Sequence, residues 1–446
     1  MGKRIAAAFI LVSLITLSLV GVSPTRAFSR TITVPDDYST ITAALRYASS
    51  GDTVLVKKGV YEEKTLTIDK LILLIGEDAN GTLINLHPPQ VPETIFTATL
   101  MVYSPPIRIE ADGVKLSGFT LISDGGMMAA YADSARIEGN VMISKTEGIV
   151  ISMSVYAVGD ANQIVGNSMG NLIVSGLDNV IAENSIAGSI EVTGSHNNVT
   201  ANNVTGNFSG IILAGSFNTV DGNILMGGLN SGGIDLDGDL NTVVRNLINN
   251  SASIRISRGS NNYVYENSIT NSRGGLRVIR GYNNTFYSNY IANNAYGVLF
   301  GGSQTDFSYG NGGPMASNNT AYHNNFINNT DQVKKTDYII YGTNFYDNGK
   351  EGNYWSDYVG NDTNNDGIGD TPYIIDESRR DNFPLIFPFD VESNTIVVPS
   401  AETETAPTTA LVTAAVAVLA IAGIGLAVYI RRHRFRLKAE KESNSI

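Results

Sequence analysis

The sequence contains no cysteine, one tryptophan, four histidines and 13 prolines in 446 residues. Without cysteine the chain has neither a disulfide framework nor a thiolate metal site. The histidines are scattered and form no recognisable metal-binding motif. The formal net charge of -12 opposes a phosphate backbone, so we expect no nucleic-acid partner. The 43% hydrophobic content excludes a disordered chain.

An apolar run follows the basic pair Lys3 and Arg4 at the N-terminus and ends in small residues near Ala27. This layout predicts a secretory signal over residues 1–27, with an uncleaved first membrane helix as the alternative. The predicted export implies that most of the chain lies outside the cytoplasm.

A second apolar run near the C-terminus predicts a transmembrane helix over residues 409–430. A basic tail over residues 431–446 follows it at once, which indicates a cytoplasmic C-terminus. A Thr/Glu/Pro-rich linker over residues 391–408 precedes it. We therefore predict a cell-surface protein whose extracellular part is anchored in the cytoplasmic membrane by one C-terminal helix.

Pairs of asparagines five residues apart recur about every twenty residues. The residue two positions after each asparagine is mostly apolar, so the two side chains share one face of a β-strand. If successive coils stack about 4.8 Å apart, the inward amides can hydrogen bond to one another as a structural ladder. The pairs are Asn162 with Asn167, Asn179 with Asn184, Asn198 with Asn203, Asn218 with Asn223, Asn241 with Asn246, Asn262 with Asn267, Asn284 with Asn289, and Asn319 with Asn324.

A third short strand per repeat is visible as IEVTGS, IDLDGD, IRISRG and LRVIRG, which begin at Ile190, Ile234, Ile254 and Leu276. Three strands per coil predict an all-β fold, a parallel β-helix, and parallel crossovers favour the right hand. Residues 39–48 read as a short N-terminal capping helix. We predict the β-helix over residues 28–343 and a C-terminal cap over residues 344–390.

Three segments resemble known β-helix proteins. VPDDYSTITAALRYASSGDTVLVKKGVYEE resembles the opening segment of pectin-modifying enzymes and of NosD-like periplasmic proteins linked to copper delivery. The asparagine repeats resemble the NosD-type repeat and the wider carbohydrate-binding and sugar-hydrolase class. GNYWSDYVGNDTNNDGIGDTPYIID resembles a closing module of archaeal surface proteins. The resemblance implies a pectin-lyase-like right-handed solenoid over roughly Ile32 to Pro388 and leaves the activity open among enzymes and binders.

The segment NDTNNDGIGD matches the first part of an EF-hand calcium loop. Oxygen ligands occupy positions 1, 3, 5, 7 and 9, and Gly367 provides the sharp turn at position 6. Tyr373 stands at position 12 in place of a bidentate glutamate. The pattern predicts a structural calcium site, with a plain Asp/Asn turn as the alternative. The expected ligands are Asp362, Asn364, Asp366, Ile368 and Asp370.

A charged column is predicted on the outside of the third strand. Its members in consecutive coils are Asp235, Arg255 and Arg277, with Asp237, Arg258 and Arg280 close by. β-Helix polysaccharide lyases use a basic residue to abstract a proton next to a uronate carboxylate, so Asp235, Asp237, Arg255 and Arg277 are the candidate catalytic residues if the protein is an enzyme. Adjacent arginines also suit an anionic sugar, with Arg258 and Arg280 as further ligand candidates. A solvated charge ladder is the alternative.

A tyrosine column is predicted from the third position of the repeat, at Tyr265, Tyr287 and Tyr322. Aromatic faces in a row suit sugar rings, and covering the flank of the helix is the alternative role. Acceptor motifs for N-glycosylation occur at Asn80, Asn198, Asn203, Asn207, Asn249, Asn283, Asn318, Asn328 and Asn361.

These patterns favour a non-catalytic glycan-binding or cell-envelope protein. The alternative is a polysaccharide lyase or glycoside hydrolase that acts on acidic glycans. A further alternative is NosD-like copper handling, against which the unpatterned Met101, Met127 and Met128 count.

Overall fold

The computed structural model describes residues 29–89, 105–124, 127–146, 149–206, 210–227, 232–301, 316–335, 342–390 and 395–396. The chain divides into two units, Met1–Val397 and Val398–Ile446, and every described residue lies in the first. The predicted signal over 1–27, the transmembrane helix over 409–430 and the tail over 431–446 lie outside the described residues. Among the residues described, no helix is long and apolar enough to cross a membrane.

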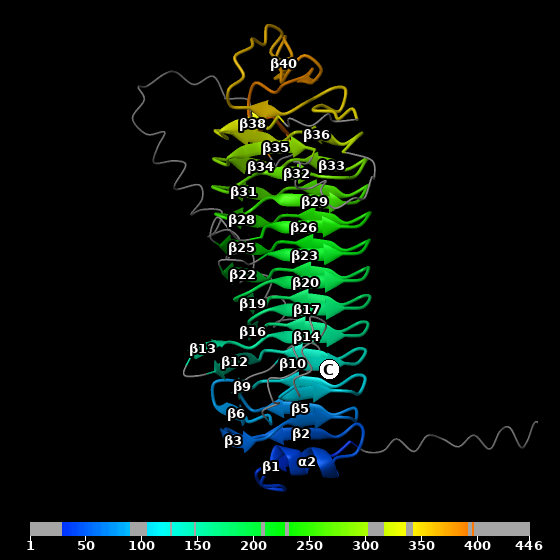
Figure 1. Ribbon diagram of the computed structural model, residues 1–446, viewed down its shortest axis with the longest axis vertical. Coiled ribbons are helices and arrows are strands. Elements are labelled where there is room, and N and C mark those ends of the chain that lie inside the picture. Colours follow the sequence, from blue (N-terminus) through cyan, green and yellow to red (C-terminus); the bar gives the residue numbers. More distant parts are fainter. Residues whose placement is uncertain are drawn as a thin grey trace, which may run out of the picture. The chain divides into compact units, whose positions relative to one another are not determined.

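Three long parallel sheets form the body of this unit, because the chain visits each sheet once per coil (Figure 1). Sheet A consists of β1 (Thr31–Val34), β2 (Thr53–Val56), β5 (Leu73–Gly76), β8 (Lys115–Ser117), β11 (Arg136–Glu138), β15 (Gln163–Val165), β18 (Val180–Ala182), β21 (Asn198–Thr200), β24 (Thr219–Asp221), β27 (Thr242–Val244), β30 (Tyr263–Tyr265), β33 (Thr285–Tyr287) and β36 (Thr320–Tyr322).

Sheet B follows sheet A in each coil. It consists of β3 (Gly59–Glu63), β6 (Thr82–Leu86), β9 (Thr120–Ser123), β12 (Val141–Thr146), β16 (Ser168–Met169), β19 (Ser185–Ile186), β22 (Asn203–Gly206), β25 (Ile224–Gly227), β28 (Leu247–Asn249), β31 (Ser268–Thr270), β34 (Tyr290–Ala292), β37 (Asn325–Ile327) and β39 (Tyr354–Trp355). β13 (Ile149–Ser152) pairs antiparallel with β12 and stands off this path.

Sheet C closes each coil. It consists of β4 (Leu66–Ile68), β7 (Ile107–Ile109), β10 (Met128–Tyr131), β14 (Val155–Val158), β17 (Leu172–Ser175), β20 (Ile190–Thr193), β23 (Ile211–Ala214), β26 (Ile234–Asp237), β29 (Ile254–Arg258), β32 (Leu276–Val278), β35 (Tyr296–Phe300) and β38 (Asp331–Val333). The predicted all-β architecture with three short parallel strands per coil is therefore confirmed.

Inward side chains fill the coil as stacked aliphatic columns. In-register neighbours on sheet A, all 0% exposed, are Ile164, Ile181, Val199, Val220, Val243 and Val264. Each is the apolar residue two positions after an asparagine. These branched side chains are buried in register on successive coils, so apolar surface is removed from water along the stack. This burial is the main contribution to the stability of the fold.

Two asparagine columns stand at corners of the coil, one before sheet A and one between sheets A and B. In the first, the Asn218 backbone N–H donates to Asn241 Oδ1 over 2.8 Å. In the second, the Asn223 backbone N–H donates to Asn246 Oδ1 over 2.9 Å, and Asn246 Nδ2 donates to the Val220 carbonyl over 2.9 Å. The first column contains Asn162, Asn179, Asn197, Asn218, Asn241, Asn262, Asn284, Asn319 and Asn344. The second contains Asn140, Asn167, Asn184, Asn202, Asn223, Asn246, Asn267, Asn289, Asn324 and Asn353.

In one coil the predicted ladder pair is wrong by one residue. Asn197 and Asn202 are the ladder members, each 1% exposed, whereas Asn198 and Asn203 face solvent. Both corners carry an Asn-Asn dipeptide, so the spacing of asparagines fits either assignment. The alternation of buried and exposed residues decides between the two assignments. With Asn197 and Asn202 in the ladder, the inward residues two positions later are the buried Val199 and Val204 instead of two threonines.

A third polar column, which the sequence analysis missed, follows sheet B. The Ser251 backbone N–H donates to Ser272 Oγ over 3.2 Å, and the Ser272 N–H donates to Asn294 Oδ1 over 2.8 Å. The Asn294 N–H continues the column to Asn329 Oδ1 over 3.0 Å. Two serines are followed by two asparagines here, so no single residue type marks the column in the sequence.

The turn from sheet C into sheet A repeats a Gly-x-x-Asn motif. Gly238 has φ +155°, and a Cβ at this position would lie 2.0 Å from the Gly215 carbonyl oxygen of the coil below. The residue before the ladder asparagines from Asn140 to Asn324 is left-handed, including the bulky Phe217 with φ 60° and Leu240 with φ 57°. Close backbone approach therefore dictates the glycine in every such turn.

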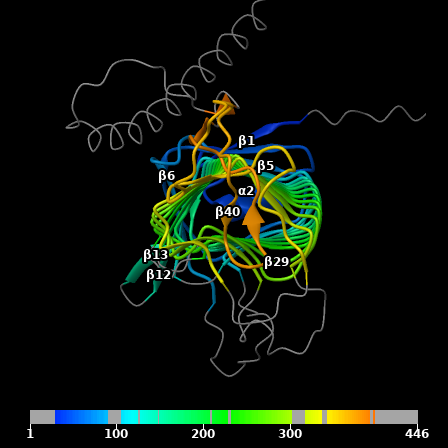
Figure 2. The same ribbon diagram turned by 90° about the horizontal axis from the view of Figure 1, so that it is seen from above.

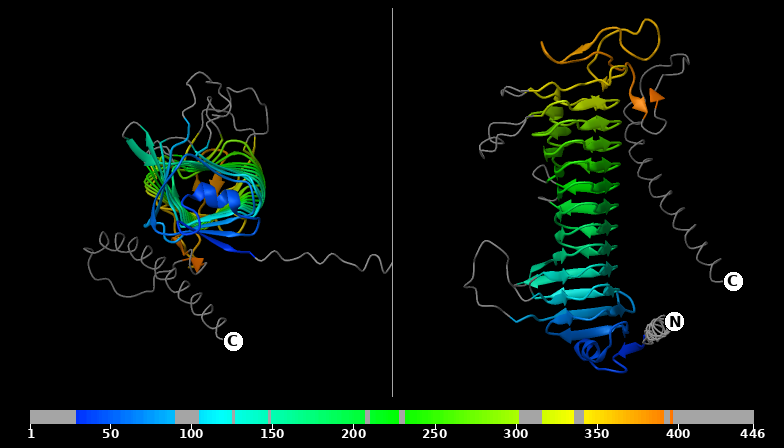
Figure 3. Two further views of the ribbon diagram at one scale, coloured as in Figure 1. Left: turned by 90° about the horizontal axis from the view of Figure 1, so that it is seen from below. Right: turned by 90° about the vertical axis from the view of Figure 1, so that its right-hand side faces the viewer.

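A short helix, α2 (Ile41–Tyr47), covers the open N-terminal end of the coils, as the view from below and the view from above both show (Figures 2 and 3). Thr40 Oγ1 caps it by accepting the Ala43 N–H over 3.2 Å, and Glu63 Oε1 accepts the Ile41 N–H over 2.7 Å. At the other end Trp355 stacks between Phe326 and Tyr373 with ring centroids 4.5 and 4.6 Å away. Two small hairpins follow, β40 (Tyr373–Ile374) with β41 (Arg380–Asp381), and β42 (Phe389–Asp390) with β43 (Thr395–Ile396).

Candidate functional site

The predicted charged column lies on the outward face of sheet C. Asp235, Arg255 and Arg277 are in register on β26, β29 and β32. Arg255 forms an ion pair with Asp235, and Ser257 Oγ donates to the second oxygen of that carboxylate over 2.7 Å. The Asp235 carboxylate is therefore held on both oxygens.

A bulge after Leu236 brings Asp237 opposite Arg258. Arg258 Nε donates to both carboxylate oxygens of Asp237, over 3.2 and 3.1 Å. This hydrogen bond raises the pKa of the Arg258 guanidinium above its already high ordinary value. Arg258 therefore stays protonated and cannot accept a proton from a substrate. Arg280 follows β32 and is half-buried.

Tyr296, which the sequence analysis did not select, lies among the arginines of this face. Its side chain is only 8% exposed. Burial raises the pKa of its hydroxyl, and the positive charges of Arg277, Arg273 and Arg255 oppose that rise. The Lys334 ammonium lies 5.2 Å from the ring centroid. We name Arg255, Arg273, Arg277, Tyr296 and Lys334 the Tyr296 cluster.

A glycine allows the tyrosine to sit this deep. A Cβ on Gly274 would lie 2.1 Å from Tyr296 Cζ, so the ring packs directly on that backbone. The Gly-Gly dipeptide before β32 is the sequence signal for the buried ring. The contact could not be predicted from one repeat alone, because Gly274 and Tyr296 belong to successive coils.

The predicted tyrosine column is present on sheet A, but its rings stack on one another. Ring centroids are 4.8 Å apart between Tyr265 and Tyr287 and 5.6 Å apart between Tyr287 and Tyr322, with interplanar angles of 8° and 11°. Burial and the neighbouring tyrosines raise the pKa of Tyr287 to about 12. Both faces of the middle ring, Tyr287, are therefore covered by its neighbours instead of being free for a sugar ring, as expected from the sequence.

The predicted calcium loop lies in the C-terminal cap. Asp362 Oδ2 accepts the Gly367 N–H over 2.8 Å, Asp366 Oδ1 accepts the Ile368 N–H over 2.9 Å, and Asp370 Oδ2 accepts the Thr363 N–H over 3.0 Å. Asn364 Nδ2 donates to Asp366 Oδ2 over 2.9 Å. Carboxylates and amides thus share one loop with the left-handed glycine that such a loop needs, which fits oxygen-ligated calcium. Within the described part of the chain, no three His, Cys, Asp or Glu side chains gather closely enough to hold a metal. Calcium binding stays a prediction.

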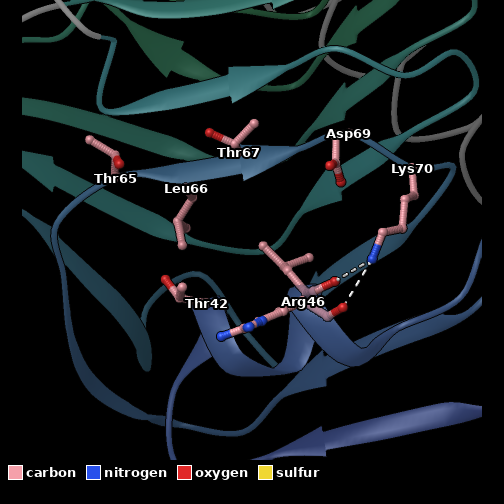
Figure 4. A pocket seen from close by; sticks show the side chains of 8 residues that line it. Thr42, Arg46, Thr65, Leu66, Thr67, Asp69 and Lys70 are labelled. Atoms are coloured by element: carbon pink, nitrogen blue, oxygen red, sulfur yellow. Dashed lines mark hydrogen bonds between the residues drawn. The ribbon is translucent and has the colours of Figure 1, made fainter.

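A shallow hollow of ≈ 370 Å³ lies between α2 and β4 at the N-terminal end (Figure 4). Its lysine is already engaged, because Lys70 Nζ donates to the carbonyls of Leu45, Arg46 and Ala48 over 3.2, 3.0 and 3.0 Å. Lys70 therefore caps the C-terminus of the helix. The hollow contains no cluster like that around Tyr296.

Comparison with known sequences places the charged face inside a family match. Residues 178–316 match the family described as periplasmic copper-binding protein (NosD). The matched segment contains both the charged column and Tyr296. No curated protein matches the chain.

Several solved structures are similar to the chain at low identity and with TM-scores below 0.5. The A-module of mannuronan C-5 epimerase AlgE4 from Azotobacter vinelandii is 13% identical, over 68% of this chain and 93% of that chain, with a TM-score of 0.48. The catalytic domain of a GH87 alpha-1,3-glucanase in complex with nigerose is 13% identical, over 73% and 69%, with a TM-score of 0.47. A mannuronic acid specific polysaccharide family 6 lyase from human gut microbiota is 13% identical, over 71% and 91%, with a TM-score of 0.42. Over residues 178–316 the chain is therefore similar to the NosD family, and its three parallel sheets form a parallel β-helix.

Proposed function

We propose that the protein is a non-catalytic binding protein of the cell envelope that holds acidic glycans on the outward face of sheet C. The Tyr296 cluster carries the proposal, because Lys334 lies 5.2 Å from the ring of this buried tyrosine and the charges of three arginines act on its hydroxyl, in a chain of net charge -12. Guanidinium groups bind carboxylates and sulfates through paired hydrogen bonds. Strands about 4.8 Å apart place Arg255 and Arg277 to contact successive charged groups of an extended polymer.

The contacts of the acidic side chains favour binding over catalysis. Asp235 and Asp237 each form an ion pair with an arginine of the next coil. A lyase base must be unprotonated when substrate arrives, whereas the candidate base Arg255 is held in its charged form by the ion pair with Asp235. The same contacts suit a rigid, charged surface whose side chains keep their positions.

The proposal includes the signal and the anchoring helix predicted from the two terminal apolar runs. Together these would hold the β-helix on the outer side of the cytoplasmic membrane, where envelope glycans are available. Binding to a repeating polymer needs a long and rigid surface, which a stack of identical coils supplies.

The test is a glycan array probed with the full-length chain in detergent micelles. We expect binding to uronate-bearing and sulfated oligosaccharides, weakened by salt, and none to neutral ones. Arg273→Gln and Arg277→Gln should each lower affinity about tenfold, because each removes a charge-assisted hydrogen bond. Lys64→Gln, at an exposed lysine of the N-terminal coil, should leave affinity unchanged. Release of cleaved products, or equal binding to neutral glycans, would overturn the proposal.

A further inference from the structure

One coil carries two asparagines on the outward faces of its strands. Asn198 begins β21 on sheet A, and Asn203 begins β22 on sheet B. Both are exposed, and in the described part of the chain neither side-chain amide forms a hydrogen bond. Asparagine is depleted in strands because it packs poorly on a pleated surface. Neither fold nor packing therefore accounts for these two amides.

Each of these asparagines is followed two residues later by a threonine on the same face. Thr200 ends β21, and Thr205 lies within β22. Side chains two apart in a strand point the same way, so amide and hydroxyl share the solvent side. Asn-x-Thr is the acceptor motif for N-glycosylation.

The preceding asparagines cannot carry a sugar. Asn197 Nδ2 donates to the Gly176 carbonyl and to Asn218 Oδ1, both over 3.1 Å. Asn202 Nδ2 donates to the Ile181 carbonyl and to Asn223 Oδ1, both over 2.9 Å. A substituent on either nitrogen would remove a buried hydrogen bond. Each Asn-Asn dipeptide thus joins a structural asparagine to one that is open to modification.

We propose that Asn198 and Asn203 are both N-glycosylated, so that one coil carries two glycans on adjacent sheets. Transfer from a lipid-pyrophosphate-linked oligosaccharide joins Asn Nδ2 to the anomeric carbon of the sugar. The bond from that carbon to the pyrophosphate breaks, the lipid pyrophosphate leaves, and Nδ2 loses one proton. The proposal rests on the predicted export of the chain and not on glycan binding by sheet C.

The positions of the motifs keep sheet C free. Among the described residues, no Asn of an acceptor motif lies on a strand of sheet C. The others occupy turns, the cap or β28 of sheet B: Asn80, Asn249, Asn283, Asn318, Asn328 and Asn361. The strand faces that bear Asn198 and Asn203 are those of sheets A and B. The strand face of the Tyr296 cluster therefore stays open to a ligand while the other two carry sugar.

The experiment is glycopeptide mass spectrometry of the full-length chain made in a eukaryotic secretory host. Thr200→Val and Thr205→Val keep a β-branched side chain and remove the hydroxyl that the acceptor motif requires. We expect each to abolish the glycan on its own asparagine only, while Thr200→Ser and Thr205→Ser retain it. Melting temperatures of the four variants report whether the fold is kept.

A control acceptor makes a negative result decisive. Ser29→Asn completes a motif with Thr31 at an exposed position near the N-terminus. A glycan at position 29 with bare Asn198 and Asn203 would overturn the proposal. The absence of a glycan at all three positions would also overturn it, because the proposal rests on export of the chain to the compartment where the transferase acts. Acidic-glycan binding by the same variants is measured separately, so a failure of the proposed function would leave the occupancy result unaffected.

Discussion

Asp381 ends the second asparagine column by accepting the hydrogen bond of the last member, Asn353. The Asn353 backbone N–H donates to Asp381 Oδ2 over 2.7 Å, and Trp355 Nε1 donates to the same oxygen over 2.9 Å. The Phe383 N–H donates to Oδ1 over 3.0 Å. Another asparagine here would bring an amide nitrogen that needs acceptors of its own, whereas both oxygens of the Asp381 carboxyl group accept hydrogen bonds. A carboxyl group therefore suits the end of a ladder that passes N–H donors upward.

The first prediction concerns pH. Complete burial raises the pKa of Asp381 from 3.8 to about 7, against the lowering effect of its hydrogen bonds. The folded protein thus binds this proton more tightly than the unfolded chain. The stabilisation is fully present below the unfolded pKa and is lost as pH rises through about 7. We expect the unfolding free energy to fall by up to about 1.4 kcal/mol per pH unit between the unfolded pKa of 3.8 and the folded pKa of about 7.

The matched variant is Asp381→Asn, which keeps the shape and cannot ionise. Melting temperatures from pH 5 to pH 8 should decline for the wild type and change less for the variant. Parallel curves for the two proteins would show that Asp381 does not titrate in this range.

The second prediction concerns the interior of the ladder. Asn246→Ala removes the acceptor of the Asn223 N–H and the amide donor to the Val220 and Val244 carbonyls, of which Val244 still accepts the Gly222 N–H. Buried groups without partners cost about 1–3 kcal/mol each, so we expect a loss of about 2–4 kcal/mol. Asn198→Ala, made in a bacterial host, should change stability by less than about 0.5 kcal/mol. Denaturant unfolding of both variants checks the difference, and equal losses would contradict a structural role for the column.

The period of the fold was readable from the sequence because each asparagine is tied to an apolar residue two positions later. That two-residue step fixes which face points inward, and the three strands per coil follow from the length of the repeat. The same rule corrects the single misplaced pair, because Val199 and Val204 are the residues that must be buried. Where two asparagines are adjacent, the hydrophobic alternation specifies the register and the asparagine spacing does not.

Two features of the site could not be predicted from the sequence. Tyr296 lies beside Gly274 only because neighbouring coils stack, so its contact joins residues of different repeats. The tyrosine column was placed correctly along the chain, yet its rings stack on one another because in-register aromatic side chains on adjacent strands come within contact distance. The position of a residue within its repeat can be predicted from the local sequence. Contacts between side chains of different repeats also depend on their rotamers.

The third prediction concerns the turn glycine. Gly238→Ala would put a Cβ 2.0 Å from the Gly215 carbonyl oxygen at φ +155°, so a coil must shift. We expect a loss of more than about 2 kcal/mol. Gly222→Ala is the control, since it has φ +63° and no atom within 4 Å of the added Cβ, and should cost about 1 kcal/mol. Thermal melts of the two variants measure the difference, and a smaller loss for Gly238→Ala would contradict the close approach of the turns.

The last prediction concerns calcium in the cap loop. If Asp362, Asp366 and the Ile368 carbonyl bind the ion, calcium at about 100 times its dissociation constant should stabilise the cap by about 2.7 kcal/mol. Magnesium at the same concentration should stabilise it less, because it accepts fewer and more rigidly placed oxygen ligands. Asp366→Asn should abolish most of the gain, whereas Asp178→Asn, at an exposed left-handed turn position, should not. The measurement is the melting temperature with calcium, with magnesium and with a chelator. Identical values under the three conditions would make the loop a plain Asp/Asn turn held by its own amides.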